Sequence, residues 1–252
     1  QSPDVVEQVI RPTGLVDPIV SIRPIKGQVA DLIAEAKACV AANNRVLVTT
    51  LTKKSSEELT DYLINAGFKV KYLHADIESL ERLDILHDLR QGVIDIIVGV
   101  NLLREGLDLP EVALVAILDA DKEGFLRNER SLIQTMGRAA RNLNGQVILY
   151  ADKETRSIQR AQAETQRRRH IQLAHNQRHQ IIPRSVSRKM QDIRSKERAQ
   201  KEAAIQSVVS TVDTVEAKIK LLTEQMEAAA TALNFEWAAL LRDQIEALEK
   251  TK

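Results

Sequence analysis

Short β-branched runs alternate with segments of helical period between residues 28 and 150, and this alternation constrains the fold more than any other feature. The apolar period predicts helices over residues 28–42, 54–66 and 79–91. The β-branched runs predict strands over residues 46–50, 70–73, 94–98, 112–118 and 146–150. Three of these runs are almost continuously apolar, as strands buried on both faces are. The pattern predicts an α/β fold in which helices cover both faces of a parallel sheet.

Residues outside this region predict further parts of the chain. Four of the six prolines fall in residues 1–27, which indicates a connector with short strands. We expect an Arg- and Gln-rich helix over residues 153–180, so the α/β domain extends from residue 28 to residue 182. Residues 183–214 have no clear apolar face and indicate a polar, basic linker that permits helix.

A narrow apolar stripe returns in the last part of the chain, residues 215–252. Its spacing is typical of coiled-coil-like packing, and the stripe changes phase near Asn234 and Phe235. This change favours two antiparallel helices over one long rod. Because so small a hairpin buries little apolar surface, we expect a partner or self-association to complete its core.

Composition excludes several classes of protein. No apolar run approaches the roughly 18 residues that cross a bilayer, and the stretch from Gln1 to Gln8 is not a signal peptide. The single cysteine, Cys39, forms neither an intramolecular disulfide nor a cysteine-rich zinc site, which fits a cytoplasmic location. His175 and His179 lie one helical turn apart with no evident third ligand, so no metal site is expected. Since the chain begins without Met, we interpret it as a piece of something longer.

The formal net charge of +1 conceals a basic segment. Residues 153–202 hold fourteen Lys or Arg and five Asp or Glu, a local charge of +9 that leaves −8 for the rest of the chain. This segment is either a surface that tracks DNA phosphates or a solvated helical face. Aromatic residues make up only 3% of the chain, which leaves little capacity for base stacking.

Two arginines form the strongest candidate site. Arg138 and Arg141 are three residues apart in an expected helical stretch that also contains Gln134, so the two arginines share one face. Two guanidiniums presented together suit a triphosphate, because each can make bidentate, charge-assisted hydrogen bonds to phosphate oxygens. The alternative is a surface helix whose arginines form ion pairs.

The segment after the apolar run 94–98 is a second candidate. It leaves the carboxyl end of a strand, where ligands bind in parallel α/β sheets. Gly106 would let the backbone approach a ligand, and Asp108 would accept a hydrogen bond from a ribose hydroxyl. The alternative is a turn, closed by Pro110, that only joins two strands.

These two segments resemble motifs V and VI of the superfamily 2 helicases. Within that superfamily the sequence is similar, nearly letter for letter, to the UvrB family, the damage-verifying subunit of the bacterial UvrABC excision nuclease. The similar stretches are residues 11–15, 48–54, 101–108 and 118–126, and the resemblance covers residues 6–182. Residues 235–243 are similar to the UVR motif, through which this family is understood to engage the nuclease subunit UvrC. The resemblance implies a RecA-like helicase C-terminal lobe, a helical linker and an antiparallel helical hairpin.

The resemblance also implies a role for each matching residue. Arg138 and Arg141 would be arginine fingers that reach the γ-phosphate of ATP, and Gln134 would couple the nucleotide state to lobe closure. Other residues on the nucleotide side would be Glu105, Gly106 and Asp108. Residues nearer the DNA backbone would be Thr50, Thr52, Lys53, Asn101 and Arg104. Residues that dock a partner would be Phe235, Glu236 and Arg242. The implied ligands and partners are ATP with Mg²⁺, damaged DNA, and UvrA-type and UvrC-type subunits.

The sequence departs from the family pattern in ways that bear on activity. The 252 residues contain no Gly-x-x-x-x-Gly-Lys-[Ser/Thr] phosphate loop and no acidic box, so we expect no ATP hydrolysis by this chain alone. Trp237 stands where the UVR motif usually has a polar residue, and it either packs or marks a partner-specific face. One alternative is a non-catalytic module that recruits repair factors. Another, a generic RNA-helicase lobe, is disfavoured because that pattern lacks the UVR motif.

Overall fold

The computed structural model describes residues 7–73, 77, 79–100, 109–185, 215–231, 241–242 and 245. The chain divides into two compact units, Gln1–Ser187 and Arg188–Lys252, and each is described by itself. The described part of the first unit is built from alternating strands and helices. Within the described ranges, no helix is both long enough and apolar enough to cross a membrane.

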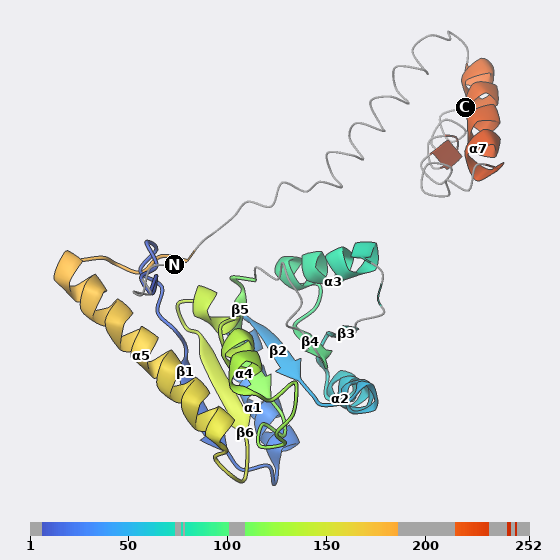
Figure 1. Cartoon of the computed structure of the whole chain (residues 1–252). Helices are drawn as coiled ribbons and strands as arrows, with labels where there is room; N and C mark the ends of the chain where they lie inside the picture. Colours follow the sequence, from blue (N-terminus) through green and yellow to red (C-terminus); the bar gives the residue numbers. More distant parts are fainter. Residues whose placement is uncertain are drawn as a thin grey trace, which may run out of the picture. The chain divides into compact units, whose positions relative to one another are not determined.

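Six parallel strands form one sheet in the first unit, in the order β1-β6-β5-β2-β4-β3 (Figure 1). The strands are β1 Ile19–Arg23, β2 Arg45–Thr49, β3 Val70–Leu73, β4 Ile96–Gly99, β5 Val112–Ile117 and β6 Gln146–Tyr150. β2, β4 and β5 are buried along their whole length, which explains why their sequences lack polar alternation. The predicted parallel sheet is therefore confirmed, and β1, from the proline-rich segment, adds an edge strand.

Helices cover both faces of this sheet. They are α1 Gln28–Ala41, α2 Lys53–Asn65, α3 Ser79–Gln91, α4 Glu129–Met136 and α5 Arg156–His179. On one face α1 and α2 pack against Val46 and Val48, and on the other α3, α4 and α5 pack around Leu47. The layers separate in this way because successive side chains of a strand point to opposite faces. Burial of each such Val or Leu contributes roughly 1.5–3 kcal/mol to folding.

Side-chain caps set where three of these helices begin. The side chains of Thr52, Asn128 and Thr155 each accept a hydrogen bond from the backbone N–H three residues later. Each bond satisfies an N–H group that has no partner within the helix, which favours a helix start at that position. The caps of α2 and α4 follow β2 and β5 in the chain. They set where the two helices that carry Lys53 and Gln134 begin.

The segment that precedes β1 packs on α5. Arg11 forms a bidentate ion pair with Asp17, with both N–O distances at 3.0 Å. The fully buried Gln172 of α5 accepts a hydrogen bond from the backbone N–H of Arg11 (2.7 Å) and donates one to its carbonyl (3.2 Å). Asn176 donates to the carbonyl of Gly14 (2.7 Å). These bonds hold the connector against α5 at two positions, Gln172 and Asn176, that lie about one helical turn apart.

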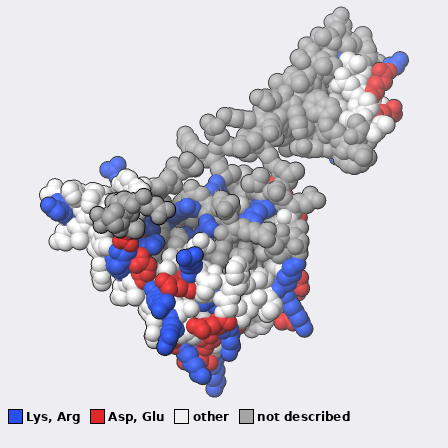
Figure 2. All heavy atoms as spheres, in the orientation of Figure 1, with Lys and Arg blue, Asp and Glu red and all other residues white. Residues whose placement is uncertain are grey.

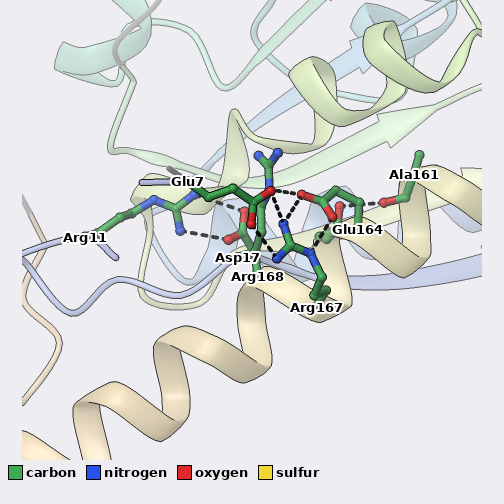
Figure 3. Close-up of polar contacts among 8 residues, drawn as sticks. Glu7, Arg11, Asp17, Ala161, Glu164, Arg167 and Arg168 are labelled. Carbon is green, nitrogen blue, oxygen red and sulfur yellow. Dashed lines mark hydrogen bonds and ion pairs between the residues drawn. The ribbon is translucent and has the colours of Figure 1, made fainter. Parts of the chain in front are cut away.

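Arg167, Arg168 and Arg169, which are consecutive in α5, have partners within the first unit. Arg167 contacts Glu164 (2.7 Å) and Glu7 (3.0 Å), and Arg168 contacts Glu164 (2.6 Å) (Figure 3). Arg169 donates to a carbonyl of the connector (2.6 Å). On the face drawn in Figure 2, Lys and Arg side chains are interspersed with Asp and Glu. In this part of the basic segment the arginines therefore hold the fold together.

The described part of the second unit includes helix α7, Val215–Thr231. Leu222 and Ala229, both from the predicted apolar stripe, are buried in it, and so is Leu241. The predicted junction of two antiparallel helices near Asn234 and Phe235 lies outside the described residues.

Candidate functional site

The two candidate arginines lie in a tightened turn after α4. The expectation of one helical stretch through residue 141 is wrong, because α4 ends at Met136 and a 3₁₀ turn covers Ala139–Arg141. The backbone N–H of Gly137 still bonds four residues back, while that of Arg138 bonds only three residues back, to Thr135 (3.1 Å). Since a 3₁₀ helix has three residues per turn, Arg138 and Arg141 still point to one side.

Both arginines are partly buried, and Gln134 is exposed on the last turn of α4. The turn lies at the amino-terminal edge of the sheet, because the Asn142 side chain that follows it donates to the carbonyl of Pro110 (2.9 Å), just before β5. Arg138 and Arg141, which are expected on the nucleotide side, therefore lie at this edge.

The residues expected near DNA lie at the opposite, carboxyl edge. Thr50 directly follows β2 and is buried, and its hydroxyl bonds Ser56 (2.5 Å) and the carbonyl of Thr52 (3.1 Å). Thr52 caps α2, and both Thr52 and Lys53 are exposed. Thr50 therefore shapes the loop, and Thr52 and Lys53 lie exposed at the start of α2.

The sequence did not predict a role for a second loop at the carboxyl edge, which contains Phe125 and Arg127. Arg127, only 3% exposed, donates to the carbonyls of Leu118 (2.9 Å) and Thr49 (3.3 Å) at the ends of β5 and β2. Burial lowers the pKa of Arg127 to about 10, so the guanidinium stays charged at neutral pH. The loop that it anchors presents Phe125, 82% exposed, to solvent. Neither feature has a sequence signal, because arginine is usually exposed and phenylalanine buried.

Seven of the site residues predicted from the sequence lie outside the described residues: Asn101, Arg104, Glu105, Gly106, Asp108, Phe235 and Glu236. The first five of these residues lie in the segment between β4 and β5, whose ends are described. Gly99 ends β4 at the carboxyl edge, and Pro110 precedes β5 at the amino edge. Of the docking candidates, Arg242 lies in a described helical stretch and is exposed.

Acidic groups near the carboxyl edge serve the fold. A carboxylate oxygen of Asp121 accepts hydrogen bonds from the backbone N–H groups of Asp152 (3.0 Å) and Lys153 (3.3 Å). Among the residues that the structure describes, no group of three or more His, Cys, Asp or Glu could hold a metal ion.

Three family models match the chain in sequence order. The helicase conserved C-terminal domain matches residues 27–143, ultra-violet resistance protein B matches 149–191, and the UvrB/uvrC motif matches 216–251. The UvrABC system protein B of Listeria monocytogenes serotype 4b (strain F2365) is 56% identical over 249 residues, 97% of this chain. That of Methanobrevibacter smithii is also 56% identical, over 252 residues and 100% of this chain. This chain belongs to the UvrB family.

The chain spans 38% of the length of each of these UvrB relatives. Its helicase-domain match ends one residue after Asn142, so it includes both the arginine turn and the carboxyl-edge loops. Among solved structures, a DEAD box protein from the hyperthermophile Methanococcus jannaschii aligns with a TM-score of 0.48 and 18% identity, covering 62% of this chain and 41% of that chain. The RecA-like helicase C-terminal fold expected from the UvrB resemblance is confirmed.

Proposed function

We propose that this chain is part of an ATP-dependent DNA repair protein and supplies the arginine half of its ATP site. The observation that supports the proposal is the 3₁₀ turn Ala139–Arg141, because three residues per turn would bring Arg138 and Arg141 to one side. Two guanidiniums in that arrangement match the γ-phosphate, and they stabilise negative charge that develops as the phosphoryl group transfers. Membership of the UvrB family supports the same role.

The residues fit a nucleotide with Mg²⁺ only in part. The arginine turn can bind phosphate oxygens, and Glu105, Gly106 and Asp108 complete the nucleotide side of the site. The magnesium ion neutralises phosphate charge when it is bound. Its ligands and the phosphate loop come from another part of the protein, so this chain alone does not hydrolyse ATP.

The DNA-binding surface in this proposal is the carboxyl edge of the sheet. The N-terminal end of α2, capped by Thr52, and the Lys53 ammonium bind backbone phosphates. Asn101 and Arg104 extend this surface, and Thr50 holds its loop. The exposed ring of Phe125 offers a stacking face for a base of damaged DNA.

Partner docking belongs to the second unit. The match of residues 216–251 to the UvrB/uvrC motif supports a surface for a UvrC-type nuclease subunit that includes Phe235, Glu236 and Arg242. UvrA-type subunits and a second copy of the hairpin are further partners in this proposal. The arginine turn distinguishes a catalytic part from a pure recruitment module.

Substitution of the arginines tests the proposal. In the full-length protein, Arg138→Ala and Arg141→Ala should each lower DNA-stimulated ATP turnover by about 10³- to 10⁵-fold, the range observed when an arginine finger is lost. The matched control is Arg130→Ala, which removes an arginine of α4 that lies outside the turn. Unchanged turnover in both finger variants would favour a non-catalytic interaction module.

A further inference from the structure

Asn142, the residue after the arginine turn, makes more long-range polar contacts than its position on a surface turn suggests. Its side-chain N–H group donates to the carbonyl of Pro110 (2.9 Å) and to the side-chain oxygen of Asn44 (3.3 Å). Its side-chain oxygen accepts a hydrogen bond from the backbone N–H of Asn144 (2.9 Å). Both ends of one carboxamide are therefore engaged at once.

The partners of this carboxamide come from different parts of the sheet. Pro110 leads into β5 and Asn44 leads into β2, 32 and 98 residues away in sequence. Pro110 also ends the segment that carries Gly106 and Asp108. A single side chain thus joins the arginine turn to the residues that lead into two strands at the centre of the sheet.

Backbone contacts around Asn142 also tie the arginine turn to the turn that follows it. The turn is a 3₁₀ helix of three residues, a geometry whose hydrogen bonds are poorer than those of an α-helix. Its carbonyl at Ala139 accepts from the backbone N–H of Asn142 (3.3 Å), and the Asn142 carbonyl accepts from Gly145 (3.2 Å). A Cβ on Gly145 would overlap the Ala139 carbonyl oxygen, so the following turn packs directly against the arginine turn.

We propose that Asn142 is a positioning residue, one that fixes Arg138 and Arg141 relative to Pro110 and Asn44, the residues that lead into β5 and β2. The inference rests on the proposed ATP site and assigns Asn142 no contact with nucleotide. Asparagine suits the role because its amide donates and accepts at the same time, whereas aspartate only accepts and leucine does neither.

The test measures ATP turnover and nucleotide affinity in the full-length protein with saturating DNA. Asn142→Ala should lower the maximal turnover by about 10- to 100-fold, because a displacement of about 1 Å of a catalytic group costs this much. The KM for ATP should change far less than the turnover. Asn44→Ala, which removes only one of the three contacts, should give a smaller loss. Asn144→Ala is the matched control, since its backbone N–H still reaches the Asn142 oxygen.

A combined variant separates positioning from mere loss of stability. If Asn142 acts through the two arginines, adding Asn142→Ala to the Arg138→Ala/Arg141→Ala double variant should lower its turnover no further. A further loss in this triple variant, or turnover by Asn142→Ala equal to wild type, would overturn the inference. Unchanged turnover in Arg138→Ala itself would instead overturn the proposed function, so the two failures are distinguishable.

Discussion

At the scale of single residues, buried arginines shape the loops at both edges of the sheet. Arg45, at the start of β2, donates to the carbonyl of Leu89 (2.9 Å) and to that of Asn44 (3.1 Å). Its guanidinium closes the C-terminal end of α3, where Gly92 has a φ of 76° and where a Cβ would overlap the Arg45 side chain. A cation at this end of a helix also interacts favourably with the helix dipole.

Arg45 therefore has a measurable effect on stability. Arg45→Ala removes the guanidinium hydrogen bonds to the carbonyls of Leu89 and Asn44, and the free energy of unfolding should fall by about 2–4 kcal/mol. Urea denaturation checks this value. The control is Lys54→Ala, which removes an exposed pair with Glu58 at 3.8 Å and should change the free energy of unfolding by less than about 0.5 kcal/mol. Equal losses in the two variants would contradict the capping role.

At the scale of elements, α5 and the connector are held together by a charged cluster. Hydrogen bonds from Arg167, and then from Arg168, lower the pKa of Glu164 to about 2 from its ordinary 4.5 (Figure 3). Because the folded-state pKa lies below the unfolded one, the stabilisation from Glu164 is complete above about pH 4.5. It is lost as the pH falls toward about 2.

The pH dependence gives a prediction for this cluster. Between pH 5 and pH 2, the free energy of unfolding of the wild-type chain should fall more steeply than that of Glu164→Gln, whose amide does not titrate. Urea denaturation at several pH values in this range measures both slopes. Parallel slopes would show that Glu164 contributes nothing to the acid dependence.

Elements also show which parts of the structure the sequence could predict. Periodicity placed α1 to α3 and five strands to within about two residues, because burial on one or both faces leaves a direct pattern. The end of α4 was not predicted, since a shift from four-residue to three-residue hydrogen bonds changes no residue type. The pairing of Arg167 with Glu7, 160 residues away, likewise depends on the tertiary fold.

The candidate site was predictable in part for the same reason. Arg138 and Arg141 form a local pattern. Their three-residue spacing favours one side in a 3₁₀ helix as well as in an α-helix. The long-range contacts of Asn142 and the burial of Arg127 carry no local signal. Their roles depend on how β2 and β5 lie beside each other, which only the three-dimensional structure provides.

At the scale of the whole molecule, the proposed ATP site and the proposed DNA-binding surface lie at opposite edges of the sheet in the first unit. The arginine turn lies at the amino edge of the sheet, and the start of α2 lies at the carboxyl edge. The segment between Gly99 and Pro110 joins the two edges through the sequence. In the proposed function, ATP hydrolysis therefore involves the amino edge and DNA contact involves the carboxyl edge.

The most direct test is the dependence of ATP turnover on DNA concentration in the full-length protein. We expect Arg138→Ala to lower the maximal turnover by about 10³-fold or more while the DNA concentration at half-maximal stimulation stays near that of wild type. Lys53→Ala should raise that half-maximal DNA concentration, and more so at higher salt, because it removes a phosphate contact. If both variants changed only the same parameter, the two edges would not have separate tasks and the account would be contradicted.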